Sequence, residues 1–196
     1  MSLGKIFHPV TSNNEGLINT YEGHIIDLRQ PTLEGIDIKD IANALSKICR
    51  FNGHVKTHIN VALHSIMAAR MCVNPKEKLA YLLHDATEAY LGDIVTPLKH
   101  ILGYEFAVIE QRFEDVIFEK FNVQPFNHGE LKVIDNHLLV LEHEYYQADI
   151  SRNYELLLMD LFDFAERRSI KINPIRFAYD YFLSDFYTYQ KEVSNG

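Results

Sequence analysis

The sequence predicts an all-α fold, built as one bundle of about seven helices. Apolar residues recur at the three- and four-residue spacing of helices from residue 38 onward, whereas strand-like alternation is almost absent. Glycines and prolines separate these segments at helix-length intervals. With 196 residues, of which 47% are hydrophobic, the chain is long enough to bury one core. We therefore expect a single domain over residues 1–196.

The first part of the chain, residues 1–37, is rich in turn-forming residues and predicts an irregular lead-in. Within it, residues 23–28 favour a strand. Residues 38–48 then place their apolar side chains on one side of a short helix. Gly53 interrupts this pattern, so a new element is expected after it.

Two central helices are expected on either side of a proline. The first runs over residues 58–72 and ends before Pro75, because proline cannot continue the hydrogen-bond ladder. Pro75 suits the first turn of the next helix, which we expect to continue to about Leu91 and to stop at Gly92. Residues 38–146 should therefore hold the core helices, including any site built on them.

The remaining helices are expected over residues 104–121, 129–147, 152–168 and 174–190. We expect residues 147–196 to cover the core. The last helix carries seven aromatic residues: Phe177, Tyr179, Tyr181, Phe182, Phe186, Tyr187 and Tyr189. They suit either a contact with another subunit or a core-covering face, and the second interpretation is favoured.

Charge and cysteine content limit the classes of function. The formal net charge of −8 disfavours binding to a nucleic acid polymer, but a small anionic substrate stays open because a bound cation can invert the local field. Two cysteines, Cys49 and Cys72, suit a reducing compartment better than a disulfide framework. We expect no membrane span and no signal peptide, and hence a cytoplasmic protein.

His64 lies on the helix over residues 58–72 among small apolar side chains such as Val61 and Ala68. For a single histidine in such a place, a core residue hydrogen-bonded to a backbone carbonyl is the plainer interpretation. A metal ligand is the alternative, and other elements must decide between the two.

The next helix, LAYLLHDATEAYL, is apolar on every side and therefore predicted to be buried. It nevertheless places Tyr81, His84, Asp85 and Glu88 on one stripe. Buried ionisable groups must be paired or must bind a metal, and no lysine or arginine lies on this stripe. A divalent cation is the economical partner.

Two further candidates are weaker by themselves. Asp135 sits beside the apolar face of the helix over residues 129–147, where a solvated carboxylate is the plainer interpretation. Glu142 on the same stripe is interpreted as a structural partner of the core rather than as a ligand. His54 and His58 have the spacing of a zinc-protease helix, but the glutamate that should follow the first histidine is missing, which excludes that class.

Beyond these patterns, the chain resembles the HD-domain phosphohydrolases of the 5′-deoxynucleotidase type, especially their small phage and bacterial members. The likeness covers about residues 21–146. It rests on four stretches in order: DIANALSKICRFNGH, INVALHS, LLHDATEAYLGDIVTPLK and VIDNHLLVLEHE. The resemblance implies an HD-domain fold and metal-dependent hydrolysis of a phosphate ester.

The resemblance implies a metal centre held by His64, His84, Asp85 and Asp135. Two imidazoles and two carboxylates suit a divalent transition metal, with Mn, Co, Fe, Ni and Zn all open. Asp85 could bridge two ions, so the number of ions is also open.

The same resemblance implies the residues that act on substrate. Glu88 and Asp93 are the expected catalytic residues, with Asp93 alternatively holding the sugar. Arg50 is expected to clamp the phosphate. Thr96 and Lys99 are expected near the phosphate as well.

One position departs from the family pattern. Family members with a known sugar preference carry tryptophan directly after the arginine, whereas this chain has Phe51 there and no tryptophan at all. Phenylalanine can stack on a sugar or base but cannot donate an N–H. Selectivity for deoxyribose is therefore the least secure part of the expectation.

The expected activity is release of phosphate from a nucleoside 5′-monophosphate, with deoxyribonucleotides as the expected class and a homodimer left open. One alternative is an HD hydrolase of another nucleotide, such as a cyclic nucleotide, a triphosphate or an alarmone. A second is a non-catalytic nucleotide or metal sensor, against which the presence of Glu88 argues.

Overall fold

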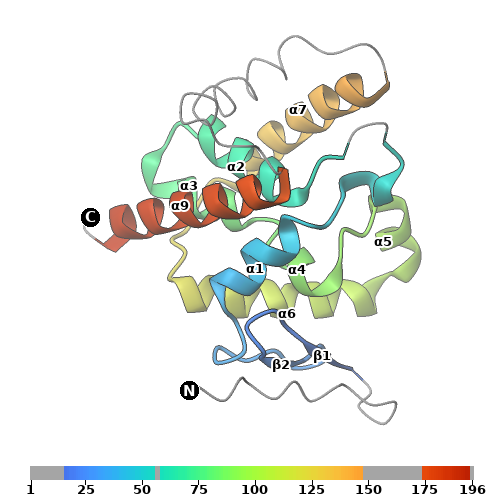
Figure 1. Cartoon of the computed structure of the whole chain (residues 1–196), viewed down its shortest axis with the longest axis vertical. Helices are drawn as coiled ribbons and strands as arrows, with labels where there is room; N and C mark the ends of the chain where they lie inside the picture. The colour runs from blue at the N-terminus through green and yellow to red at the C-terminus, as the bar shows by residue number, and fades with distance from the viewer. Residues whose placement is uncertain (1–15, 56–57, 148–173, 195–196) are drawn as a thin grey trace.

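Helices build most of the described chain, which in this computed structural model comprises residues 16–55, 58–147 and 174–194 (Figure 1). The predicted all-α bundle is confirmed. The α-helices are α1 (Ile38–Leu45), α2 (Val61–Met71), α3 (Lys78–Leu83), α4 (Glu88–Leu91), α5 (Thr96–Leu102), α6 (Tyr104–Phe121), α7 (His128–Gln147) and α9 (Pro174–Ser194). Two 3₁₀ turns, η1 (Arg50–Gly53) and η2 (Pro75–Glu77), lie between them. The helix expected over residues 152–168 lies outside the described residues.

A small hairpin precedes the helices. Strands β1 (Leu17–Asn19) and β2 (Ile25–Asp27) pair antiparallel, so the strand expected within residues 23–28 is found and a partner joins it. The turn between the strands is tied to α1 by the buried Asp40. Its carboxylate accepts a hydrogen bond from the Glu22 backbone N–H at 2.6 Å and contacts His24 Nδ1 at 2.8 Å.

Short polar side chains cap the N-termini of helices α1 and α2. Asp37 accepts from the Lys39 N–H at the start of α1, and Asn60 accepts from the Leu63 N–H at the start of α2. Each satisfies one of the backbone donors that the first helical turn leaves unpaired. The start of α2 is thereby fixed one turn before His64.

The prediction of one continuous helix from Pro75 to Leu91 is wrong in one respect, because the helix is broken at residues 84–87. There the Ala86 N–H donates to the Leu83 carbonyl and the Glu88 N–H to the Asp85 carbonyl, both at 3.0 Å. These bonds span three residues, so the chain tightens from an α-helix into a 3₁₀-like turn. The break falls on His84 and Asp85, two of the predicted metal ligands.

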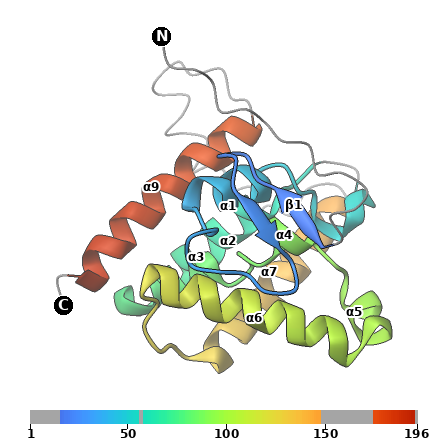
Figure 2. The same cartoon turned by 90° about the horizontal axis from the view of Figure 1, so that it is seen from below.

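Helix α2 lies at the centre of the bundle and packs against α3, α7 and α9 (Figure 2). Helix α1 packs against α4 and α9. From α9, the side chains of Ala178, Phe182 and Phe186 enter the core. The core-covering interpretation of the C-terminal aromatic helix is therefore confirmed. In the described part of the chain, no helix combines the length and apolar character needed to cross a bilayer.

Candidate metal centre

Two imidazoles meet inside the bundle. His64 comes from the middle of α2 and is fully buried, and His84 comes from the turn that ends α3. Their Nε2 atoms lie 3.3 Å apart. The structure therefore brings together two histidines that are separated by a full helix and a loop in the sequence.

Two carboxylates reach the same point. Asp135 of α7 places Oδ1 at 3.4 Å from His64 Nε2. Asp85 places Oδ2 at 3.2 Å from His84 Nε2 and 3.6 Å from His64 Nε2. Ligand atoms of His64, His84 and Asp135 all lie within 4.8 Å of one another, and Asp85 adds its oxygen beside the two imidazoles. His64, His84 and Asp135 thus form one group, and Asp85 contacts both imidazoles. Asp135 directs one oxygen toward this group, and its other oxygen lies 3.2 Å from Lys132 Nζ.

Hydrogen bonds at the far side of each ring fix how the imidazoles face the centre. The Tyr81 carbonyl accepts from His84 Nδ1 at 2.7 Å, and Glu142 Oε1 accepts from His64 Nδ1 at 2.8 Å. Both acceptors require a proton on Nδ1, which leaves Nε2 of the neutral ring with its lone pair. Two lone pairs facing each other at 3.3 Å repel unless a cation or a proton lies between them.

The electrostatics of the metal-free centre agree with that requirement. Burial and Arg50 lower the pKa of His64, but Glu142 and Asp135 outweigh them and raise it to about 9. Burial would raise the pKa of Asp85, yet His84, His64 and Arg50 hold it well below its usual range. A proton on His64 thus supplies positive charge that offsets the negative charge of the neighbouring carboxylates. A divalent ion bound by the same ligand atoms would do the same.

Glu142 does more than the core-partner role expected from the sequence. It is fully buried, and besides its bond to His64 its Oε2 accepts from Arg50 Nε at 2.9 Å. One carboxylate therefore orients a candidate ligand and the candidate phosphate clamp together. The sequence placed Glu142 two helical turns after Asp135 on the same face of the helix, but no nearby residue pattern indicated that His64 and Arg50 are its partners.

A cavity of about 700 Å³ opens beside this centre, and we call it the metal-side cavity. Its walls include every predicted catalytic and substrate-binding residue and both predicted carboxylate ligands: Arg50, Phe51, Asp85, Glu88, Asp93, Thr96, Lys99 and Asp135. Residues from η1, α4, α5 and α7 thus share one hollow of a size ordinary for small-molecule sites.

Glu88 is the most unusual group in this wall. It is 7% exposed, and its Oε2 has no hydrogen-bond partner among the residues that the structure describes. Burial raises its pKa well above the usual value, and the neighbouring carboxylates of Asp85 and Asp93 raise it further. A buried carboxyl group whose pKa is raised in this way is suited to acid–base work.

The loop beside the cavity joins three of the predicted residues. Phe51 donates its backbone N–H to Asp93 Oδ2 at 3.1 Å, and its ring lies against the Arg50 guanidinium, 5.5 Å from ring centroid to Cζ. Arg50 also places Nη1 at 3.6 Å from Asp85 Oδ2. Asp93 is therefore engaged in holding the loop, while Arg50 bridges the loop and the metal centre.

The two residues expected near the phosphate lie on α5. Thr96 is the first residue of that helix and Lys99 follows one turn later. Lys99 Nζ is already held at 2.6 Å by Glu110 of α6. This ion pair competes with any contact between Lys99 and a phosphate. Lys99 therefore lines the cavity, but its ammonium group is already engaged.

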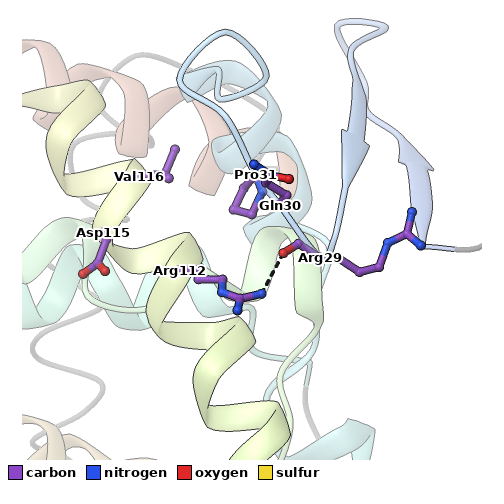
Figure 3. A pocket seen from close by; sticks show the side chains of 6 residues that line it. All are labelled: Arg29, Gln30, Pro31, Arg112, Asp115 and Val116. Atoms are coloured by element: carbon purple, nitrogen blue, oxygen red, sulfur yellow. Dashed lines mark hydrogen bonds between the residues drawn. The ribbon is translucent and has the colours of Figure 1, made fainter.

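A separate cavity of about 410 Å³ lies between the segment after β2 and α6, and we call it the α6-edge cavity (Figure 3). Its lining includes Arg29, Pro31, Arg112 and Asp115. Arg112 Nη1 donates to the Arg29 backbone carbonyl at 2.9 Å. The figure shows the Arg29 side chain turned away from Arg112, so the two guanidinium groups do not converge.

Comparison with known proteins places the chain among bacterial relatives. The uncharacterized protein YfdR of Escherichia coli (strain K12) is 36% identical over 126 residues, which are 64% of this chain and 69% of that protein. The chain belongs to the YfdR family. A second relative, the uncharacterized protein RCAP_rcc00048 of Rhodobacter capsulatus, is 34% identical over 109 residues, or 52% of this chain and 56% of that protein. No family model matches the chain.

Proposed function

We propose that this chain is a metal-dependent phosphohydrolase of the HD-domain type, which releases phosphate from nucleoside 5′-monophosphates, deoxyribonucleotides being the expected class. One observation carries the proposal. Donor atoms of His64, His84 and Asp135 lie within 4.8 Å of one another beside a cavity that is also lined by Glu88 and Arg50. Ligands for a cation, a proton carrier and a phosphate-binding group therefore share one place.

His64, His84, Asp85 and Asp135 would hold the divalent ion, which is proposed as Mn, Co, Fe, Ni or Zn. When bound, such an ion polarises a phosphoryl oxygen and lowers the pKa of a water molecule. The chain prepares for it through the hydrogen bonds that fix both Nδ1 atoms and leave both Nε2 atoms toward the centre.

Glu88 is the proposed proton carrier. Burial and the neighbouring carboxylates raise the pKa of its carboxyl group, which favours the protonated form, and the oxygen of the leaving alcohol can receive that proton. Asp93 lies in the same wall and also has a raised pKa, caused by burial and by Asp85. Because Asp93 already accepts from Phe51, a positioning role for the loop and the sugar suits it better than proton transfer.

Arg50 is the proposed phosphate-binding group. Glu142 holds its Nε, which fixes the plane of the guanidinium and aims its terminal nitrogens. The Phe51 ring lies beside it and offers an apolar face for a sugar. A cytoplasmic setting belongs to this proposal and is supported by Cys49 and Cys72, both of which are free thiols.

The test is a phosphate-release assay with the purified full-length chain. Each of the five metals is combined with a panel of nucleoside monophosphates, cyclic nucleotides, triphosphates and an alarmone. We expect release from monophosphates and a loss of at least about a thousandfold in His84→Ala, because removal of a metal ligand removes the charge stabilisation of the reaction.

The matched control is His137→Ala, which changes an exposed histidine of α7 two residues beyond Asp135. This variant should keep wild-type activity. Release from another substrate class would redirect the proposal to the alternative HD hydrolases. Nucleotide binding without any phosphate release would favour the sensor and overturn the enzymatic proposal.

A further inference from the structure

A third hollow adjoins the metal-side cavity across α5. This α5–α6 cavity has a volume of about 620 Å³ and is lined by α5 and the first turns of α6. Thr96 and Lys99 line both hollows, so the two share a wall. Figure 2 shows α5 folded back at one end of α6, which places this hollow at the rim of the molecule.

The α5–α6 cavity has an aromatic lining and an apolar rim. Tyr104 and Phe106 line it, and Tyr104 is 83% exposed as the first residue of α6. On the neighbouring turn of α5, Ile101 is 81% exposed and Leu102 46% exposed. Exposed apolar side chains gathered at one place beside a candidate site indicate a surface that binds something.

Besides His100, the lining of this hollow contains one lysine and one glutamate, which pair with each other. Glu110 holds Lys99 Nζ at 2.6 Å, so the cation at the shared wall is already neutralised. The α5–α6 cavity is therefore suited to a flat, uncharged group rather than to a second phosphate. The anionic end of a ligand belongs instead beside Arg50, in the metal-side cavity.

We propose that the α5–α6 cavity binds the nucleobase of the nucleotide whose phosphate lies at the metal centre, with Tyr104 and Phe106 as the stacking surfaces. This inference rests on the proposed function. A nucleoside monophosphate is long enough to occupy two subsites, and Thr96 and Lys99 border both hollows, so the two hollows lie next to each other. Because every base has a π-face, stacking accepts all bases with little discrimination.

The first test compares a nucleotide with its base-free analogue, using the metal that supports activity. Deoxyadenosine 5′-monophosphate and 2-deoxyribose 5-phosphate present the same phosphate and sugar. In Tyr104→Ala we expect KM for the nucleotide to rise about tenfold, since base–aromatic stacking contributes about that much to binding. KM for deoxyribose phosphate should stay unchanged, and the exposure of Tyr104 means that folding is not at risk.

The second test uses the absence of tryptophan from the chain. Tyr104→Trp introduces a single fluorophore at the proposed base site, and Glu88→Gln in the same protein suppresses turnover. Titration with deoxyadenosine 5′-monophosphate should quench its emission saturably, whereas deoxyribose phosphate should not. Tyr21→Trp in the same Glu88→Gln background is the matched control, because Tyr21 is 58% exposed at the β-hairpin and lines none of these cavities.

The outcomes separate the two proposals. If the wild type releases phosphate from no ester, the proposed function fails. If it hydrolyses both esters and Tyr104→Ala changes their KM values equally or not at all, only the base site is wrong. Emission of Tyr104→Trp that follows protein concentration rather than nucleotide would assign the α5–α6 surface to contact between two copies and would equally overturn the base site.

Discussion

The metal-side cavity and the α6-edge cavity are both lined by an arginine, but the arginine charge is buried in the first and exposed to solvent in the second. Arg50 is 8% exposed and contacts the fully buried Glu142, far away in sequence. The Arg29 side chain is 64% exposed and pairs with Asp27, two residues earlier. A charge pair in water costs little to keep, whereas buried charges must be held by their surroundings. The metal-side cavity is therefore distinguished from the α6-edge cavity by its buried, oppositely charged side chains rather than by its volume.

The largest effect in this comparison is expected from Glu88→Gln. Loss of the proton carrier should lower turnover by about a hundredfold to ten-thousandfold. The melting temperature of the metal-free protein should rise at neutral pH, because the folded state no longer opposes ionisation of a buried carboxyl group. The two effects are measured by phosphate release and by thermal unfolding.

The pH dependence of that gain follows from the sign of the shift. The pKa of Glu88 is higher in the folded state than in the unfolded state, so the wild type loses stability as pH rises above the ordinary glutamate value of 4.5. The gain from Glu88→Gln should vanish below that pH. An equal gain at every pH would show that packing, not ionisation, causes it.

Glu142→Gln should produce the next largest effect. Loss of the charge that orients His64 and Arg50 is expected to weaken metal binding about 10- to 100-fold, as for other outer partners of metal ligands. Calorimetric titration with the active metal measures this. Glu130→Gln, at a half-buried position in the first turn of α7, is the control and should bind metal normally. Unchanged affinity in Glu142→Gln would reduce Glu142 to a purely structural partner.

Metal affinity itself should depend on pH. His64 keeps its proton up to a pKa of about 9 in the metal-free protein, and the ion must displace that proton. Affinity should therefore fall by about tenfold for each pH unit below 9. Without metal, His64 stabilises the fold below its unfolded pKa of 6.5, and this contribution is lost as pH rises through 9. A metal affinity independent of pH between 6 and 9, roughly the window of this titration, would contradict the assignment.

The smallest effect is expected at the α6-edge cavity. Arg112→Ala removes one hydrogen bond to the Arg29 carbonyl at an exposed position. Activity should be unchanged, and stability should shift by no more than about 0.5 kcal/mol, as is usual at the surface. A large loss of activity would show that this cavity communicates with the metal centre and would blur the distinction between the two regions.

Local signals predicted the fold well wherever burial or capping left a trace in the sequence. Helix α6 has the expected bounds because Gly103 ends α5 with a positive φ directly before it and Asn122 ends α6 in the left-handed conformation common at helix C-termini. Helix α5 was missed because it has no buried residue, and hydrophobic periodicity arises only from burial. The break at residues 84–87 was missed because these residues carry no local turn signal, so the bend arises from tertiary packing.

The sequence predicted which residues make up the candidate site but not the hydrogen bonds and ion pairs between them. His64, His84 and Asp135 converge as the resemblance implied, although Asp135 alone suggested a solvated group. The partners of Glu142 lie 78 and 92 residues away, and no spacing rule reaches that far. Pairings of this kind depend on how helices pack, which the pattern within each helix does not specify.

The backbone at η1 has a consequence for how this family could change its ligand. Phe51 and Asn52 both adopt left-handed conformations, with φ of 57° and 52°, which are costly for residues other than glycine. The surrounding chain, including the bond from Phe51 to Asp93, therefore dictates the shape of this loop, and the side chain at position 51 does not. Another aromatic residue can replace Phe51 without reshaping the loop, so a single substitution would change the side chain presented to the metal-side cavity while the scaffold stays as it is.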